Sequence, residues 1–246
     1  MGKFPIVIPP TIRKPKLPIH DDCYEDDKLQ ELLAIASGAQ ASTVLGRASS
    51  STLVDIIDPE TGDSPLHRAA SAGVLEAMDV MMDCFGPNTS QRPSEERLFW
   101  TFMTHQNKAG DTALHSAARS GQQIVVVAIY RMFHMDALPS ENDDAERGPD
   151  SKYPAVEHVL DWDEPEAALL FLTTKNSAGR DAAAEARHAG HIGIAEWLEA
   201  LAENLDVNRQ RTDKIAMRLL EKSVLDRYWY LDDTEAEEDG FHGSDI

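Results

Sequence analysis

The chain has 246 residues, of which 43 are acidic and 23 are basic, so its formal net charge at pH 7 is −20. A surface this negative repels phosphate, which argues against direct binding to nucleic acid or to an anionic membrane and favours a basic protein partner. Hydrophobic residues make up 42% of the sequence, enough to build a core and to exclude a wholly disordered chain.

The expected compartment follows from the absence of export signals. No apolar run approaches the roughly 18 residues that a membrane-spanning helix needs. The apolar stretch 4–10 is too short, and too interrupted by proline, for a secretion signal. The two cysteines, Cys23 and Cys84, are too few for a disulfide scaffold. We therefore expect the protein in the cytoplasm and the nucleus.

The chain begins with a basic, proline-rich segment, which predicts an extended tail over 1–26. An amphipathic helix that ends at Gly38 follows it. We predict that 27–57 forms an atypical first repeat, because the terminal unit of a stacked array has one face in water.

Three later segments align without gaps: Thr61–Gly73, Ala109–Gly121 and Ala178–Gly190. In each, an opening glycine fits a tight turn, a Ser, Thr or Asp follows as a helix N-cap, and a closing glycine ends a short helix. Apolar residues at helical spacing then predict a second helix. The predicted second helices span 74–82, 122–132 and 191–203. One such pair cannot bury its own apolar face, so the pairs must stack.

The strings S-P-L-H-R-A-A-S-A-G at 64–73 and T-A-L-H-S-A-A-R-S-G at 112–121 resemble the ankyrin repeat, and the third copy is a degenerate version. The resemblance implies an all-α ankyrin-repeat solenoid of about four repeats, the first and last degenerate, with β-hairpin-like finger turns. In that family the motif histidine, here His67 and His115, hydrogen-bonds backbone near the turn and ties one hairpin to its neighbour.

An ankyrin repeat has about 33 residues, and the copies are farther apart than that, so two insertions are expected. The first, near 86–104, should contain a short helix with three aromatic residues, and the second is acidic. A capping helix with a basic outer face is expected over 208–224. The predicted boundaries are 58–105 for a repeat with its helical insertion, 106–137 for the next repeat, 138–168 for the acidic insertion, 169–205 for the last repeat, 206–226 for the capping helix and 227–246 for an acidic tail.

Two kinds of partner-binding site are predicted. The first comprises polar side chains of the finger turns and inner helices: Asp58, Glu60, Asp63, Arg68, Asp111 and Arg119. The second comprises acid-flanked tryptophans: Trp162 with Asp161, Asp163, Glu164 and Glu166, and Trp229 with Asp232 and Asp233. A tryptophan among acids offers a basic partner contact area and cation–π attraction. Each site has an alternative interpretation that remains open. The turn residues are then ordinary polar surface, and the insertion with Trp162 is a solvated loop. The tail aromatics then pack onto the last helix, and the tail acids only solubilise the chain.

No catalytic pattern is present, since the sequence lacks a phosphate-binding loop, a dinucleotide-binding glycine pattern and a serine-nucleophile elbow. We expect no enzyme activity and no cofactor. His188 and His191 could in principle clamp a metal, but no cysteine or third histidine lies near them in sequence, and no metal site is expected.

The order of elements is similar to that of the dedicated fungal ankyrin-repeat chaperones of a KH-domain small-subunit ribosomal protein, the one numbered three. The matching strings are Asn107–His115 and Asn176–Ala182, together with the acidic end. The proline-rich basic start, the insertion at 141–166 and the aromatic run Tyr228–Tyr230 depart from the pattern. The resemblance implies a chaperone that shields a highly basic client before assembly, and we expect a monomer in a one-to-one complex. The alternatives are an ankyrin adaptor or regulatory subunit of a proteasome-assembly or chromatin complex, and a subunit that positions substrate in an enzyme complex.

Overall fold

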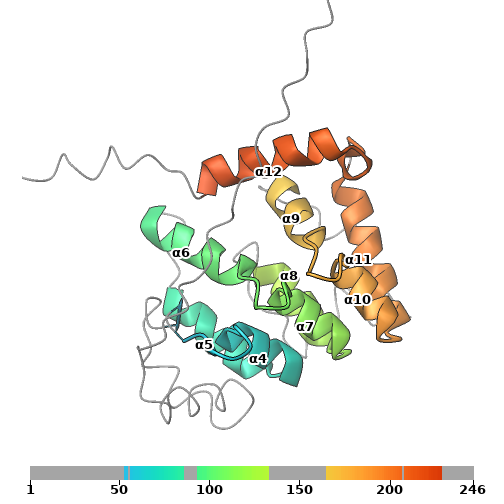
Figure 1. Cartoon of the computed structure of the whole chain (residues 1–246). Coiled ribbons are helices and arrows are strands. Elements are labelled where there is room, and N and C mark those ends of the chain that lie inside the picture. Colours follow the sequence, from blue (N-terminus) through green and yellow to red (C-terminus); the bar gives the residue numbers. More distant parts are fainter. Residues whose placement is uncertain (1–52, 55, 86–92, 133–164, 207, 229–246) are drawn as a thin grey trace, which may run out of the picture.

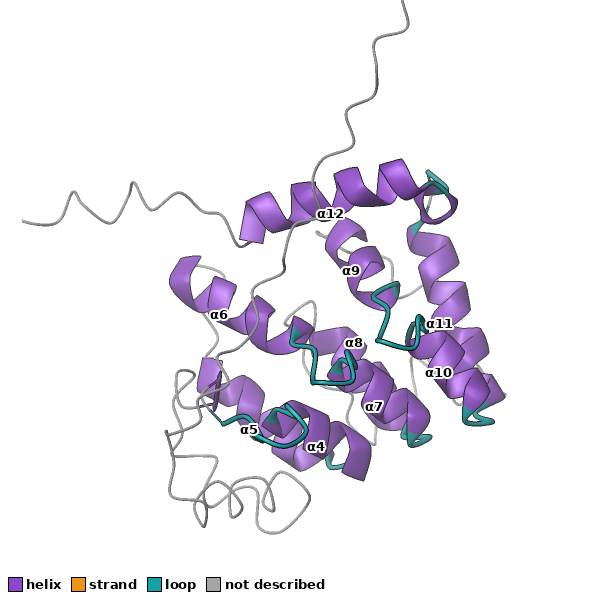
Figure 2. Cartoon of the chain, viewed as in Figure 1, coloured by secondary structure: helices purple, strands orange, loops and turns teal. Residues whose placement is uncertain are grey.

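A computed structural model describes residues 53–54, 56–85, 93–132, 165–206 and 208–228. All regular structure in these ranges is helical, without a strand, as expected for an all-α chain (Figure 2). In chain order the helices are α4 (Pro65–Ala72), α5 (Leu75–Phe85), α6 (Pro93–Thr104), α7 (Ala113–Arg119), α8 (Gln123–Met132), α9 (Pro165–Leu172), α10 (Ala182–His188), α11 (Ile192–Leu205), the 3₁₀ helix η5 (Gln210–Thr212) and α12 (Lys214–Tyr228). No helix of the described ranges combines the length and the apolar character needed to cross a membrane.

Three helix pairs stack side by side. Helices α4, α7 and α10 form one row in which α7 contacts both of the others (Figure 1). Each is followed by its partner, α5, α8 or α11, after a short turn. The stacking that the repeated segments predict is therefore present, and the second helices lie within a few residues of their expected positions.

The start of α4 illustrates how the repeated segment specifies a helix. Ser64 has extended backbone angles at the N-cap position, and Pro65 occupies the first turn, where its missing N–H leaves no bond unmade. The helix ends at Gly73, whose φ of 80° is the left-handed conformation that glycine adopts without strain. The opening and closing glycines of all three segments have positive φ.

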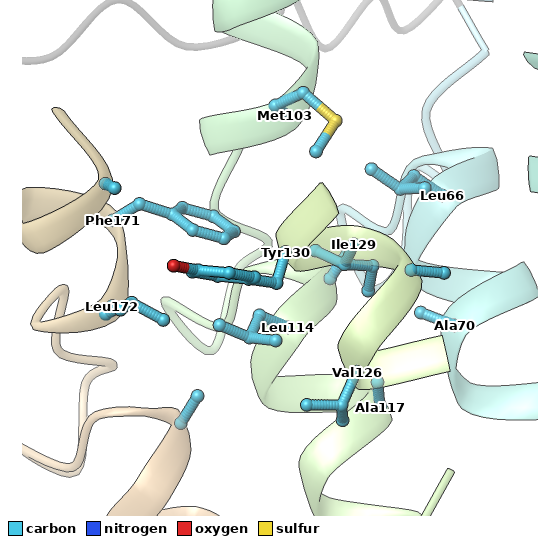
Figure 3. Packing of buried hydrophobic residues seen from close by; sticks show 14 of the residues in the cluster. Leu66, Ala70, Met103, Leu114, Ala117, Val126, Ile129, Tyr130, Phe171 and Leu172 are labelled. Atoms are coloured by element: carbon cyan, nitrogen blue, oxygen red, sulfur yellow. The ribbon is translucent and has the colours of Figure 1, made fainter. Parts of the chain in front are cut away.

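Two further helices lie between the repeated pairs. The predicted aromatic helix is α6, whose Phe99, Trp100 and Phe102 are all buried. The sequence prediction did not anticipate α9, which begins inside the region expected to be an acidic insertion. Its apolar residues pack against the second pair, where the Tyr130 side chain of α8 extends toward Phe171 and Leu172 (Figure 3).

The third pair joins the same core, because the Tyr130 ring also meets the Trp197 ring of α11 edge-on, with centroids 5.6 Å apart. The last helix, α12, contacts α9 and α6 and buries Leu220, Val224 and Leu225 (Figure 1). It begins later than predicted because a turn and η5 precede it.

The predicted first repeat at 27–57 falls almost entirely outside the described residues. Of its end, Leu53 and Ile57 belong to the buried core. The tails at 1–26 and 229–246 and most of the acidic insertion also lie outside the described ranges.

Candidate functional site

The turns that precede α4, α7 and α10 line one edge of the stack, and each folds around one polar side chain (Figure 2). The Asn107 side-chain oxygen accepts hydrogen bonds from the backbone N–H of Ala109 and Asp111, at 3.0 and 2.9 Å. Asn176 does the same for the third turn, and Asp58 takes this place in the first turn. Each turn is closed by two backbone hydrogen bonds, for example from the Asn107 N–H to the Asp111 carbonyl and from the Gly110 N–H to the Asn107 carbonyl. The described ranges contain no strand pairing, so the hairpin-like expectation holds only loosely.

The predicted histidine links are confirmed. His67 Nε2 donates to the Asp111 carbonyl oxygen at 2.9 Å, and His115 Nε2 donates to the Arg180 carbonyl oxygen at 3.1 Å. A carbonyl only accepts, so Nε2 carries the proton in both rings. Nδ1 then accepts from the N-cap of the same helix, Ser64 or Thr112. Each histidine therefore fixes its own helix start and the next turn together.

Two more links repeat at the same interval. The Lys108 N–H donates to the Thr61 carbonyl at 2.9 Å, and the Ser177 N–H donates to the Ala109 carbonyl at 2.9 Å. The amide Nδ2 of each turn asparagine donates to an aspartate of the preceding turn, Asp63 or Asp111, at 2.8 Å. We call this set of histidine, backbone and asparagine bonds the turn ladder. It holds the turn edge as one preformed surface.

The first turn carries a cluster of the predicted site residues. The guanidinium of Arg68 bonds the Asp58 carboxylate through Nη2, and its Nε lies 3.4 Å from Asp63 Oδ2. Asp58 is only 5% exposed. Burial alone would raise the pKa of Asp58, but the Glu60 and Thr61 N–H groups and Arg68 outweigh it and lower that pKa. Glu60, by contrast, is exposed at the tip of the turn.

The second cluster is larger and more deeply buried. Arg119 Nη2 lies 2.5 Å from Asp111 Oδ2 and 3.4 Å from Glu185 Oε1. Arg180 and the Asn176 amide also donate to Glu185, at 3.0 and 2.5 Å. Asp111 and Glu185 are 2% and 1% exposed. Burial would raise the pKa of Glu185, but its Asn176, Arg180 and Arg119 donors lower it.

These clusters correct one prediction. Asp58 and Asp111 were expected to face a partner, yet they lie inside the stack with their carboxylates bonded to arginine. The sequence predicted them as surface residues because it shows acids near a turn but not which cations fold over them. Arg68 and Arg119 keep 36% and 45% of their side-chain surface exposed. At these two positions the turn edge therefore presents neutralised ion pairs, whereas Glu60 remains an exposed carboxylate.

Several residues of these clusters escaped sequence reasoning. Glu185 and Arg180 lie in the degenerate repeat, where the motif gives no signal for them. The two asparagines did leave a signal, since Asn107 and Asn176 each precede an opening glycine by three residues. Among the remaining predicted site residues, Glu166 is exposed in the first turn of α9. The other acid-flanked residues lie outside the described ranges: Asp161, Trp162, Asp163, Glu164, Trp229, Asp232 and Asp233.

A groove of about 920 Å³ lies at the far end of the stack, beside α10 and α11. Its apolar lining includes Leu172, Leu198 and Met217, and its cations are Lys175, Arg187 and Arg211. Arg187 is held by a two-oxygen contact with Glu199, at 2.7 and 2.8 Å. Within the described ranges, no three His, Cys, Asp or Glu side chains gather as metal ligands would.

Comparison with known proteins gives little further identification. No family model and no curated protein matches the chain. Among solved structures, it is similar to a chain in the crystal structure of the yeast ribosomal protein Rps3 in complex with its chaperone Yar1. The two are 18% identical, the TM-score is 0.47, and the match covers 71% of this chain and 93% of that chain.

Proposed function

We propose that the protein is a non-enzymatic ankyrin-repeat chaperone that binds a basic client, a small-subunit ribosomal protein, and shields it before assembly. The ankyrin assignment rests on the two well-preserved sequence motifs, and the repeated turn ladder supports it. The client class rests on charge. We further propose that the protein acts in the cytoplasm and nucleus as one copy bound to one client.

The distribution of charge carries the proposal. The described residues hold 14 basic and 19 acidic side chains, whereas the remainder of the chain holds 9 and 24. The described residues thus carry a net charge of 14 − 19 = −5 out of −20, and their most buried acids are already paired with arginine. The excess negative charge lies in the insertion and the C-terminal tail, because residues 1–52 hold six acidic and six basic side chains.

This division suggests a mechanism with two parts. The acidic segments attract a basic client over long range, which raises the association rate. Once bound, they neutralise the positive charge of the client. Trp162 and Trp229 then supply desolvated contacts, and cation–π attraction adds to them. The helices fix one end of each segment, because α9 begins at Pro165, directly after the insertion residues 138–164, and α12 ends at Tyr228, directly before the tail. No catalytic group is needed for such a stoichiometric role.

The test is the binding of a purified KH-domain small-subunit ribosomal protein, with an unrelated protein of equal positive charge as the control. We expect one-to-one binding by light scattering, with an affinity that falls about tenfold between 50 and 300 mM salt. The paired change Asp232→Asn and Asp233→Asn should weaken binding several-fold. A matched pair on the exposed surface of α11, Glu196→Gln and Glu203→Gln, should not. Equal affinity for both basic proteins, or affinity independent of salt, would contradict the proposal.

If the protein is instead an adaptor, neutralising the acidic segments should not weaken binding of its partner. The near-neutral turn edge, with Arg68 and Arg119 half exposed over buried acids, favours a partner held by the helical body itself. An adaptor of a proteasome-assembly or chromatin complex would keep its partner after neutralisation of the acidic segments. It would lose that partner when Arg68 and Arg119 are replaced by glutamine.

A further inference from the structure

In the described ranges, no further unit of the stack covers the outward surface of the third helix pair, α10 and α11. A Cβ on Gly110 would lie 2.8 Å from the next turn, whereas one on Gly179 would meet nothing within 4 Å. The edge opposite the turns shows the same contrast. A Cβ on Gly121 would lie 2.5 Å from a side chain of the third pair, and one on Gly190 would meet nothing. The surface that α7 buries against α10 therefore has an open counterpart on α10 itself.

The groove of about 920 Å³ lies at this open surface. Ala184 lines it, and Ala184 holds the position from which His67 and His115 bond the following turn in the other units. The neighbouring helices add apolar side chains to the lining: Leu172 of α9, Leu198 and Ala202 of α11, and Met217 of α12. The groove therefore offers an apolar place for a helix where a following unit would lie.

The charges that line the groove nearly cancel. They comprise three lysine or arginine and two carboxylate side chains: Lys175, Arg187, Arg211, Asp181 and Glu199. Arg187 bonds Glu199 directly, and the Arg211 Nε lies 3.6 Å from a carboxylate oxygen of Asp206. Since these pairs are already formed, an occupant must bind the groove mainly through apolar contacts.

We infer that this groove is the docking site for a segment of the chain's own insertion, 154–162. The segment lies outside the described residues, and its place in the chain and its sequence carry the argument. It ends shortly before Pro165, where α9 begins, and α9 ends at Leu172 in the groove. Leu172 lies about 10 Å along the helix from Pro165, and the five residues from Leu160 to Pro165 span up to about 16 Å, so the segment can fold back to the groove. Such a short tether gives an effective concentration of the order of millimolar, so a few apolar contacts suffice.

The sequence of this segment has the pattern of an amphipathic helix. At about 100° per residue, Val156, Val159 and Leu160 share one side of such a helix. Glu157 and Asp161 lie on the other side. The segment begins with a proline, which suits a first helical turn, and the proline that begins α9 limits its other end. With the apolar side in the groove, the two acids face solvent.

Two other occupants fit the groove less well. The C-terminal segment follows Tyr228, about 16 Å along α12 from Met217, and its aromatic and apolar residues 229–231 form a contiguous run instead of a helical stripe. A second copy would bring together two chains that each carry a net charge of −20. The docking of 154–162 does not depend on the proposed function, because it requires only the groove and the segment.

The experiment places a photoreactive benzophenone amino acid at Thr212, an exposed residue that lines the groove, in the full chain. Irradiation followed by peptide mass spectrometry should show bonds from this position to residues 154–162. An equimolar mixture of unlabelled and ¹⁵N-labelled chains should show these bonds within one chain. The same photoreactive group at Glu196, which is exposed on α11 but does not line the groove, should not form them.

Variants of the segment test whether its apolar side makes the contact. The paired change Val156→Asp and Leu160→Asp should lower the yield of these bonds at least fivefold. The matched pair on the polar side, Glu157→Gln and Asp161→Asn, should leave the yield unchanged. Hydrogen exchange of the unaltered chain gives a readout that needs no variant. Its amides at 154–162 should exchange at least tenfold more slowly than those of a synthetic peptide of the same sequence.

Four outcomes overturn the inference. Bonds from Thr212 to 229–246 mean that the C-terminal segment occupies the groove, and bonds between differently labelled chains mean that a second copy does. A yield that ignores the paired change at Val156 and Leu160 means that the apolar side is not in contact. Exchange at the rate of the free peptide means that the segment does not dock.

Discussion

The two interfaces of the helix stack share one set of bonds and differ in how they handle charge. Between α4 and α7, and again between α7 and α10, a histidine, a backbone N–H and an asparagine amide cross from turn to turn. In the first unit, one arginine, Arg68, covers Asp58 without reaching the next unit. The second interface buries Asp111 and Glu185 under two arginines. The backbone-directed bonds repeat with the motif, whereas the ion pairs are particular to each interface.

Substitutions at the turn glycines should have the largest effect, and they test how closely neighbouring turns approach each other. Gly110 and Gly179 have nearly the same φ, 77° and 74°. A Cβ on Gly110 would lie 2.8 Å from the Ser177 backbone nitrogen in the next turn, whereas one on Gly179 would meet nothing within 4 Å. Gly179→Ala therefore measures backbone strain alone, about 1 kcal/mol. Gly110→Ala should lower the free energy of unfolding by about 3 kcal/mol, because it adds a clash with the ladder.

Urea unfolding followed by circular dichroism would measure both variants. Equal losses of stability would mean that the turns do not approach each other as closely as the ladder requires.

Charge burial provides the second test. Glu185→Ala removes the buried carboxylate that Arg180 bonds, and it leaves Arg119 and the Asn176 amide with Asp111 as their acceptor in the cluster. Breaking a fully buried ion pair costs about 3–5 kcal/mol, and the partial exposure of both arginines should reduce the loss to about 2 kcal/mol. Glu199→Ala breaks the ion pair with Arg187, in which both side chains are about half exposed. It should leave the free energy of unfolding nearly unchanged, because water screens an exposed pair.

The comparison of the two glutamate variants is made by thermal and urea unfolding of each. If Glu199→Ala proves as damaging as Glu185→Ala, burial is not what makes the second cluster costly to break.

Sequence analysis predicted local features, such as turns and helix starts, and missed contacts between residues of different segments. Glycine and cap spacing specified the turns and helix starts, and the ankyrin resemblance supplied the histidine links. The helix α9 was missed because its apolar residues directly follow an acidic run. Glu185 was missed because its burial depends on Arg180 and Asn176 of the preceding turn. The roles of Trp162 and Trp229 stay predictions, since both lie outside the described residues.

The buried histidines of the turn ladder make the stability of the fold depend on pH. Burial, with a smaller contribution from His105, lowers the pKa of His67 to about 4, below its ordinary 6.5. Burial also lowers the pKa of His115. The unfolded chain therefore binds more protons than the folded chain between pH 6.5 and about 4, so stability falls as pH falls through this window. Asp58 and Glu185 have lowered pKa values and lose their stabilising charge only at lower pH.

The variant His67→Gln tests this assignment. Glutamine at this position can still reach back to the N-cap N–H, but it cannot take up a proton. It should cost about 1 kcal/mol at pH 7 through the lost bond to Asp111. The decline in melting temperature between pH 6.5 and 4.5 should become shallower. The exposed His188→Gln is the control and should retain the full decline. An unchanged slope in His67→Gln would place the pH sensitivity elsewhere.

Small effects are expected at the end of the stack, where no further repeated turn follows. The carboxylate of Asp181 caps α10 directly by accepting the Ala184 N–H at 2.9 Å, and Asp181→Ala should cost about 1 kcal/mol. Ala184 occupies the position that His67 and His115 hold in the other segments. Ala184→His would restore the motif, but its Nε2 would find no carbonyl of a following turn. We expect a change within about 0.5 kcal/mol, measured by urea unfolding. A gain of 1 kcal/mol or more would show that the histidine stabilises its own helix without a neighbour, and that the ladder contributes less between the units than its bonds suggest.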